Sequence, residues 1–434
     1  MITGAKRLLQ PNWPGPEMLA GFKRVRLFAR SEDYRAPQIA DCEPAVLRLP
    51  LRLCASMSRH DAGWRVLRRR GRPPMNLLLV VFAAAASAVA AGTAAGDGYH
   101  LQQTVPITPG GGNFDYAAAD GVNRRVYFSH GDEVVVLDAD SNALVSKIPA
   151  PQFDPSYGIG LFGRTTPYQG IHHVGIATEL GRGFTANGRA GSSTIFDLKT
   201  LERIGEVKLT GNDPNAIVYD AATQRVFTFN EDGENATAFD AKTGQVLATI
   251  ALGARPAFAA SDDKGHVFVN LIEKNLVQRI DARNLTLAER WPAGCTAPHN
   301  ETMAIDKSNG RLFVGCRPDF RRLLNPPGPR PERIMVVLDT NDGHKVATVP
   351  IGGNPDQAAF DPGAGLAFSA NGEGTVTVIK QESPDKYSVL ETVATEPGAA
   401  RLAVDPKTLK IFAPNNDRTS TGKDQNFRIL VLGR

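Results

Sequence analysis

The stretch DAATQRVFTFN, residues 220–230, is one copy of a motif that returns along the chain. Two further clear copies are DPGAGLAFSAN at 361–371 and DPKTLKIFAPN at 405–415. In each copy an aspartate ends a short apolar run, a polar turn follows, and an aliphatic–aromatic step precedes an asparagine. A motif that recurs in tandem indicates one supersecondary unit repeated around a common core.

The repeats align on the aromatic residue of the motif. These aromatic residues are Tyr127, Phe184, Phe227, Phe268, Phe313, Phe368 and Phe412. Successive copies are 57, 43, 41, 45, 55 and 44 residues apart, and most of these steps match the ~40–45 residues of a four-stranded propeller blade. The two long steps predict insertions, at 151–170 and at 317–331.

Four strands can be assigned within one repeat. In the third repeat we expect strands A to D at 215–220, 225–230, 235–240 and 245–252, separated by turns rich in Gly, Asn and Asp. The seventh repeat ends after three strands, at 400–405, 410–415 and 427–432, whereas residues 99–108 form an orphan strand before the first repeat. Closing the ring with this N-terminal strand would remove two open sheet edges. The sequence therefore predicts an all-β, seven-bladed propeller of four-stranded antiparallel blades over residues 97–434.

Four copies of the motif carry a family resemblance. FTAN at 184–187, FTFN at 227–230, FSAN at 368–371 and FAPN at 412–415 resemble the YVTN-repeat family of seven-bladed propellers. The resemblance covers about 99–434 and departs at the asparagine position in His130, Leu271 and Cys316. It implies an exported protein of unassigned biochemical role. Relatives of the family include lactonase-like propellers and the propeller subunits of quinone-dependent amine dehydrogenases.

The N-terminal part differs from the repeats in charge and hydropathy. Residues 1–74 hold 15 of the 49 Lys/Arg and 6 of the 45 Asp/Glu, so the remainder carries a net charge of about −5. The basic excess thus lies outside the propeller, and a nucleic-acid-binding role is disfavoured. We interpret 1–74 as a disordered basic leader, and we expect residues 1–56 to be absent from the natural mature protein.

Residues 75–96 form an uncharged apolar run after the basic segment 68–72. With small residues such as Ala88-Val-Ala90 or Thr93-Ala-Ala95 behind it, this run is typical of a cleaved secretory signal peptide. An uncleaved N-terminal anchor is the alternative, because the run approaches the ~20 residues of a membrane helix. We expect a periplasmic or secreted protein, monomeric and without a membrane span after cleavage.

One position in each blade predicts a ring around the central channel. Counting back 12 residues from each aromatic, or 11 in the fourth repeat, reaches the start of every A strand. The ring residues are Asp115, His172, Asn215, Ala257, Glu301, Asp356 and Ala400. Such a ring would hold a divalent cation such as Ca2+ through oxygen ligands, or it would line a hydrated funnel. The aspartates and asparagines that most repeats share are instead expected to hold turns.

Sequence motifs for catalysis or cofactor binding are lacking. His172 and His173 are adjacent on a strand, so their side chains point to opposite sides and cannot bind one ion together. The sequence has no zinc spacing, GxSxG elbow, phosphate loop or dinucleotide fingerprint. We therefore predict no catalytic residues, no metal motif and no cofactor beyond the cation named above.

Cys295 and Cys316 are the two cysteines of the predicted propeller. If Ile305 pairs with Leu312, Cys316 lies opposite Glu301, on the same face of the ring as Cys295. A structural disulfide closing this loop is expected in an oxidising compartment and would stabilise the fold by about 3 kcal/mol. A redox pair is the alternative, although such pairs more often show CxxC spacing.

The two insertions and the channel mouth supply further candidate binding residues. Aromatic and arginine side chains on loops suit recognition of a protein, peptide or sugar, although the loops can also be mere decoration. The candidates are Tyr168, Arg255, His299, Arg317, Arg321 and Arg322.

Three functions fit these features. We favour an exported, non-enzymatic scaffold that binds a protein, peptide or small ligand through one face and the insertions. The first alternative is a lactonase-like hydrolase with a divalent cation in the channel. The second, by family analogy only, is an accessory subunit of a periplasmic quinoprotein.

Overall fold

The computed structural model describes residues 98–110, 112–150, 170–296, 299–317, 332–417 and 425–434. The leader 1–74 and the apolar segment 75–96 lie outside the described residues, and so do most residues of both insertions. All described residues belong to one compact unit, Val89–Arg434.

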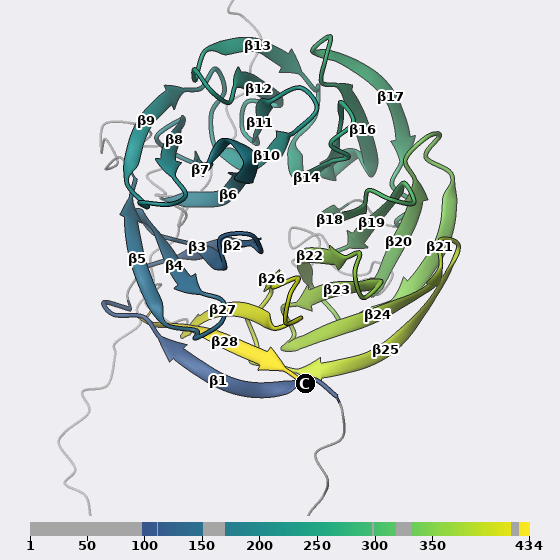
Figure 1. Cartoon of the computed structure of the whole chain (residues 1–434). Helices are drawn as coiled ribbons and strands as arrows, with labels where there is room; N and C mark the ends of the chain where they lie inside the picture. Colours follow the sequence, from purple (N-terminus) through teal and green to yellow (C-terminus); the bar gives the residue numbers. More distant parts are fainter. Residues whose placement is uncertain (1–97, 111, 151–169, 297–298, 318–331, 418–424) are drawn as a thin grey trace, which may run out of the picture. The chain divides into compact units, whose positions relative to one another are not determined.

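The described residues form seven antiparallel sheets of four strands, which confirms the predicted seven-bladed propeller (Figure 1). Blade 1 contains β2 (Phe114–Asp120), β3 (Arg125–His130), β4 (Glu133–Asp138) and β5 (Leu144–Pro149). Blade 2 contains β6 (Ile171–Ala177), β7 (Arg182–Asn187), β8 (Ser192–Asp197) and β9 (Arg203–Lys208). Blade 3 contains β10 (Pro214–Asp220), β11 (Arg225–Asn230), β12 (Asn235–Asp240) and β13 (Val246–Ala251).

The next three blades repeat this order. Blade 4 contains β14 (Pro256–Ser261), β15 (His266–Leu271), β16 (Leu276–Asp281) and β17 (Thr286–Pro292). Blade 5 contains β18 (Asn300–Asp306), β19 (Arg311–Cys316), β20 (Ile334–Asp339) and β21 (Lys345–Pro350). Blade 6 contains β22 (Pro355–Asp361), β23 (Leu366–Asn371), β24 (Thr375–Ser383) and β25 (Lys386–Ala394).

Blade 7 combines both ends of the described chain. It contains β26 (Ala403–Val404), β27 (Ile411–Asp417), β28 (Gln425–Gly433) and, as its outer strand, β1 (His100–Pro106). β1 runs antiparallel to β28, with Thr104 opposite Leu430, and Figure 1 shows the two strands side by side at the rim. The inner strand is shorter than the predicted 400–405.

Helical structure is confined to two short 3-10 helices, η1 (Thr178–Leu180) and η2 (Ile272–Lys274), within the described ranges. Across those same ranges, no helix is long and apolar enough to cross a membrane.

The hydrophobic core lies between blades. Clusters of buried side chains combine residues of neighbouring blades all the way around the ring. Phe227 and Phe239, for example, are fully buried on opposite faces of the blade 3 sheet, in separate clusters. A blade cannot bury both faces of its own sheet, so each one depends on its neighbours for stability.

The shared aspartates and asparagines hold turns, as predicted. The Asp120 carboxylate accepts hydrogen bonds from the backbone N–H groups of Val122 and Asn123, both at 3.1 Å. The Asn230 amide donates to Asn235 Oδ1 at 2.7 Å and to Thr237 Oγ1 at 3.0 Å. These side chains fix loops within one blade and are not a shared binding site.

Candidate functional site

The predicted ring positions coincide with β-bulges at the starts of the A strands. In blade 3 the pairing passes from Pro214–Asn230 to Ala216–Phe229 and skips Asn215. The same break leaves out His172, Glu301 and Asp356 in blades 2, 5 and 6, and a two-residue break includes Asp115 in blade 1. A bulge turns the extra residue away from the sheet pattern. In these five blades it thereby frees one polar side chain at the start of the A strand to contact other blades or loops.

Asp115 links three blades. Its Oδ2 lies 2.7 Å from His172 Nδ1 in blade 2. Its Oδ1 accepts a hydrogen bond from Arg401 Nε of blade 7 at 3.1 Å and lies 3.0 Å from Arg401 Nη2. Both Asp115 and Arg401 are buried.

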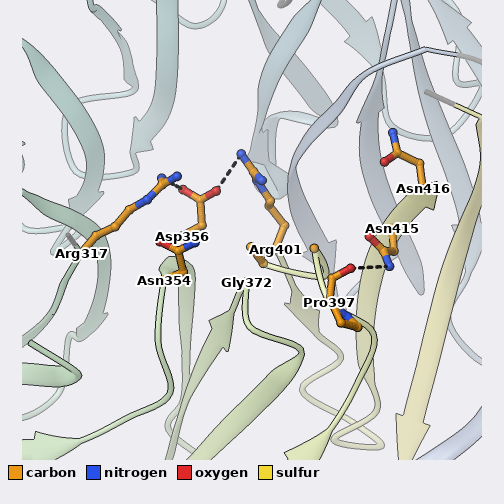
Figure 2. A pocket seen from close by; sticks show the side chains of 10 residues that line it. Arg317, Asn354, Asp356, Gly372, Pro397, Arg401, Asn415 and Asn416 are labelled. Atoms are coloured by element: carbon orange, nitrogen blue, oxygen red, sulfur yellow. Dashed lines mark hydrogen bonds and ion pairs between the residues drawn. The ribbon is translucent and has the colours of Figure 1, made fainter. Parts of the chain in front are cut away.

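Asp356 lies between two arginines. Arg401 Nη2 is 2.7 Å from its Oδ2, and Arg317 Nη1 donates to its Oδ1 at 2.7 Å. Figure 2 shows the two guanidinium groups on either side of this carboxylate. The chain of contacts continues from Arg317 to Glu301 Oε1 at 3.8 Å, and from Glu301 Oε2 to His299 Nδ1 at 3.5 Å.

At its other end the network reaches the loop before blade 3. His172 Nε2 lies 3.4 Å from Asp213 Oδ1. Asn215, the fifth polar ring residue, points elsewhere: its amide donates to Glu231 Oε2 at 3.0 Å, and Glu231 pairs with Arg255. Four of the predicted ring residues therefore share one network, and Asn215 belongs to a second cluster. We refer to the linked residues Asp213, His172, Asp115, Arg401, Asp356, Arg317, Glu301 and His299 as the channel network.

The channel network perturbs the pKa values of its members. Burial lowers the pKa of His172, but hydrogen bonds to Asp115 and Asp213 outweigh burial and raise the pKa from 6.5 to about 9. His172 is therefore protonated at neutral pH. For Asp356, burial raises the pKa, and Arg317 and Arg401 oppose that shift only in part.

Two acids of the network shift in the opposite direction. Burial would raise the pKa of Glu301, but its contacts with His299 and Arg317 hold that pKa below its ordinary value. The pKa of Asp213 is likewise lowered, because His172 beside it outweighs the effect of burial. Both groups are therefore carboxylates at neutral pH.

The ring residues do not fit a divalent cation. Ca2+ takes six to eight oxygen ligands, yet each ring carboxylate already contacts cationic side chains. Asp115 contacts protonated His172 and Arg401, whereas Asp356 contacts two guanidinium groups. A divalent ion placed among these carboxylates would face those positive charges at short range, and the repulsion would oppose binding.

Aromatic side chains fill the channel beside the network. Tyr116 of blade 1 and Phe258 of blade 4 are in edge-to-face contact, with ring centroids 4.9 Å apart. His173 packs against both rings, and its Nδ1 accepts a hydrogen bond from Ile217 N at 3.3 Å. Burial lowers the pKa of His173 from 6.5 to about 4. Adjacent histidines thus differ in charge at neutral pH, because His172 has two carboxylate partners and His173 is buried among aromatic rings.

A pocket of about 330 Å3 lies beside Asp356 (Figure 2). Its lining comes mainly from blades 6 and 7, with Arg317 contributed by blade 5. The lining residues are Arg317, Asn354, Asp356, Gly372, Pro397, Gly398, Ala400, Arg401, Asn415 and Asn416. Blade 7 has Ala400 at the ring position, and it has only a two-residue inner strand. The pocket therefore lies where the repeat is least regular.

The mouth residues follow a second offset that our sequence reasoning missed. The positions two residues before the ring hold Asn113, Asp213, Arg255, His299 and Asn354 in five blades. Arg255 and His299 were predicted individually, but Asp213 and Asn354 were not. Arg401 was also missed, because it follows the ring position of blade 7 by one residue. The constant two-residue offset from the ring positions could have identified Asp213 and Asn354 from the sequence. No feature of the repeat pattern indicated Arg401.

The predicted disulfide is confirmed. Cys295 and Cys316 are bonded, with their Cα atoms 5.6 Å apart. The expected register was wrong by one residue: Ile305 does pair with Leu312, but Cys316 pairs with Asn300 and not with Glu301. The bulge at Glu301 causes this shift, because it adds one unpaired residue to β18.

The insertion candidates are only partly described. Arg317 belongs to the channel network, whereas Tyr168, Arg321 and Arg322 lie outside the described residues. Both insertions connect at the face where the A strands begin, because one joins β5 to β6 and the other joins β19 to β20.

Asp339, Asp342 and His344 form a group with metal-ligand geometry elsewhere in the described chain. They lie at the turn between β20 and β21. Asp339 Oδ2 is 2.5 Å from Arg311 Nη1, and Asp342 Oδ1 is 2.7 Å from His344 Nδ1. These contacts explain why the three side chains lie close together, and we interpret the group as part of the turn structure.

No protein-family model matches the sequence, and no curated protein matches it significantly. The seven-bladed propeller is shown by the structure, whereas membership of the YVTN-repeat family stays a prediction.

Proposed function

We propose that the protein is an exported, non-enzymatic propeller scaffold that binds a ligand on the face where the A strands begin. The pocket beside Asp356 carries this proposal. Its volume of about 330 Å3 lies within the range of small-molecule sites, ≈ 300–1,000 Å3. Apart from Asn415, which is the motif asparagine of blade 7, its polar lining comes from positions that differ between blades, so the repeat itself does not require those side chains.

The charge arrangement supports binding over cation-assisted hydrolysis. The carboxylates that a lactonase-like site would offer to a metal are held by Arg317, Arg401 and His172. A tightly bound cation would raise the melting temperature by mass action. We expect 1 mM CaCl2 to leave the melting temperature within about 1 °C of the value in EDTA, and a rise of several degrees would favour the hydrolase.

Filling the pocket tests the binding function. Ala400→Leu adds three carbons inside the pocket, and Ala222→Leu adds the same atoms at an exposed turn on the opposite face. A ligand-observed NMR screen of small polar molecules should give hits with the wild type and with Ala222→Leu that Ala400→Leu loses. Hits retained by a folded Ala400→Leu variant would remove the pocket as the binding site.

Export is tested separately. N-terminal sequencing of protein recovered from the periplasm or the medium should find a start between residues 88 and 97. Recovery of an intact Met1 from that fraction would contradict signal cleavage.

A further inference from the structure

The pocket beside Asp356 has polar walls and small residues between them. Asn354, Asn415 and Asn416 contribute amides, Arg317 and Arg401 contribute guanidinium groups, and Gly372, Gly398 and Ala400 leave the space between them. Amides both donate and accept hydrogen bonds. Figure 2 shows the polar side chains coming from several sides.

Charge in and around the pocket is nearly balanced. Three cationic groups of the channel network, Arg317, Arg401 and protonated His172, face four acids. The acids are Asp115, Asp213, Glu301 and Asp356. Each arginine already contacts two carboxylates. A ligand carboxylate would have to compete with these buried acids, and a ligand cation would approach the guanidinium groups. The pocket therefore favours a neutral molecule.

One acceptor in the lining lacks a donor. The Oδ1 atom of Asn354 is buried and has no hydrogen-bond partner among the described residues. An unsatisfied buried acceptor costs roughly 1–3 kcal/mol, so a rotation of the Asn354 side chain that brings Oδ1 to a ligand donor recovers free energy. The Asn354 backbone has φ 64°, a left-handed conformation that asparagine and glycine tolerate best. The backbone conformation thus favours an asparagine or a glycine at this position.

The volume limits the size of the ligand. A water molecule occupies ≈ 30 Å3 of liquid, so a pocket of about 330 Å3 holds on the order of ten waters. A molecule of hexose size fits within that volume. Its groups must both donate and accept, because the lining does both.

From these features, and resting on the proposed binding function, we infer that the pocket beside Asp356 binds a neutral polyhydroxylated molecule of about monosaccharide size. A ligand hydroxyl donates to Asn354 Oδ1 once this side chain turns towards the ligand. The remaining hydroxyls exchange hydrogen bonds with the asparagine amides and with Asp356.

Calorimetric titration of the full protein tests this inference. The neutral probes are D-glucose, D-galactose, D-mannose and myo-inositol, and the charged probes are succinate and L-glutamate. At least one neutral probe should bind saturably, and neither charged probe should bind more tightly than it. Tighter binding of a charged probe, or no saturable binding of any neutral probe, would overturn the inference.

A pair of matched variants locates the binding. Asn354→Gly removes the amide and keeps the left-handed backbone, whereas Asn142→Gly makes the same change at a remote turn with φ 61°. Asn354→Gly should weaken binding of the neutral probe about tenfold, and Asn142→Gly should leave it unchanged. Equal affinities in both variants would overturn the assignment of Asn354.

The tests separate the two proposals. If a charged probe binds and Ala400→Leu abolishes that binding, the pocket is a ligand site of another class, so only the inference fails. If neither class of probe binds and the broader NMR screen finds no hit that Ala400→Leu removes, the binding function fails as well.

Discussion

Blades 3 and 7 share one motif and differ in how they are built. Blade 3 takes its strands from the continuous segment 214–251, and Asn230 ties the end of its second strand to its third. Blade 7 has a two-residue inner strand and borrows its outer strand from the other end of the chain. Its asparagine, Asn415, donates to Glu396 and to the Pro397 carbonyl in the preceding loop.

This difference explains where the pocket forms. In blade 3 the ring residue Asn215 is bonded to Glu231 and the inner strand has full length. In blade 7 the short inner strand and Ala400 leave space that Arg401, Asn415 and Asn416 surround. Regular repeats close the ring, and the irregular repeat leaves the pocket beside Asp356. Blade 7 should therefore depend on the borrowed strand β1 and on the side-chain contacts around its short inner strand.

The largest effect is expected from removing the borrowed strand. A chain beginning at residue 109 lacks β1 and loses the buried side chains of Tyr99, Val105 and Ile107. Burial of each such side chain contributes about 1.5–3 kcal/mol, so the melting temperature should fall by more than about 10 °C relative to a chain beginning at residue 97. Unchanged melting in a calorimeter would show that β1 is not needed to close the ring.

The next largest effect is expected at Arg401. Arg401→Ala leaves the buried Asp115 and Asp356 without their shared partner, which should cost about 3–5 kcal/mol in urea unfolding. Arg225→Ala is the control in blade 3, because Arg225 donates to the Ala282 and Arg283 carbonyls and not to carboxylates. It should cost about 1 kcal/mol. Equal losses of unfolding free energy in the two variants would mean that the carboxylate contacts of Arg401 contribute no more stability than hydrogen bonds to backbone carbonyls.

His172 connects the network to the loop before blade 3 and predicts a pH dependence. Its pKa is raised from 6.5 to about 9 in the folded state, so its contribution is complete below pH 6.5 and is lost as pH rises through 9. The full contribution is about 3 kcal/mol. Unfolding free energy of the wild type should therefore fall between pH 6.5 and 9 more steeply than that of His172→Gln.

His173 should change stability with pH in the opposite direction to His172. Its pKa is lowered to about 4, so its contribution is present above pH 6.5 and is lost as pH falls towards 4. His173→Gln should flatten the acid side of the stability profile only. If both variants changed the same side of the profile, the charge assignment of the two histidines would be incorrect.

The smallest effect is expected at Gln357 of β22 in blade 6. Its side chain joins the start of blade 7 to blade 1. Its Oε1 accepts from Ala117 N at 3.1 Å and Leu402 N at 3.2 Å, and its Nε2 donates to Ala117 O at 2.7 Å. Gln357→Leu leaves these buried backbone groups unpaired and should cost about 1–3 kcal/mol. The exposed Gln102→Leu should change stability by less than about 0.5 kcal/mol.

Much of the fold could be predicted because blade contacts are local in sequence. The strands β11 and β12 match their predicted limits, and β10 and β13 differ by one residue at their ends. The disulfide was also predicted, since the repeat register places its two cysteines, 21 positions apart, on the same face of the ring. The candidate site was predicted in part. Four of the ring residues lie in one contact network, but Asn215 joins another cluster, and Arg401 and Asn354 were missed.

The sequence by itself determined the seven repeats, their strand order and the places where the repeat changes. Short antiparallel turns make those features readable from neighbouring residues. Only the tertiary structure decided which polar side chains meet at the channel. Asp115 and Arg401 are 286 residues apart in the chain, and one bulge residue is enough to redirect a side chain. The pocket forms where these distant segments come together. It lies at blade 7, which has a two-residue inner strand and an alanine, Ala400, at the ring position.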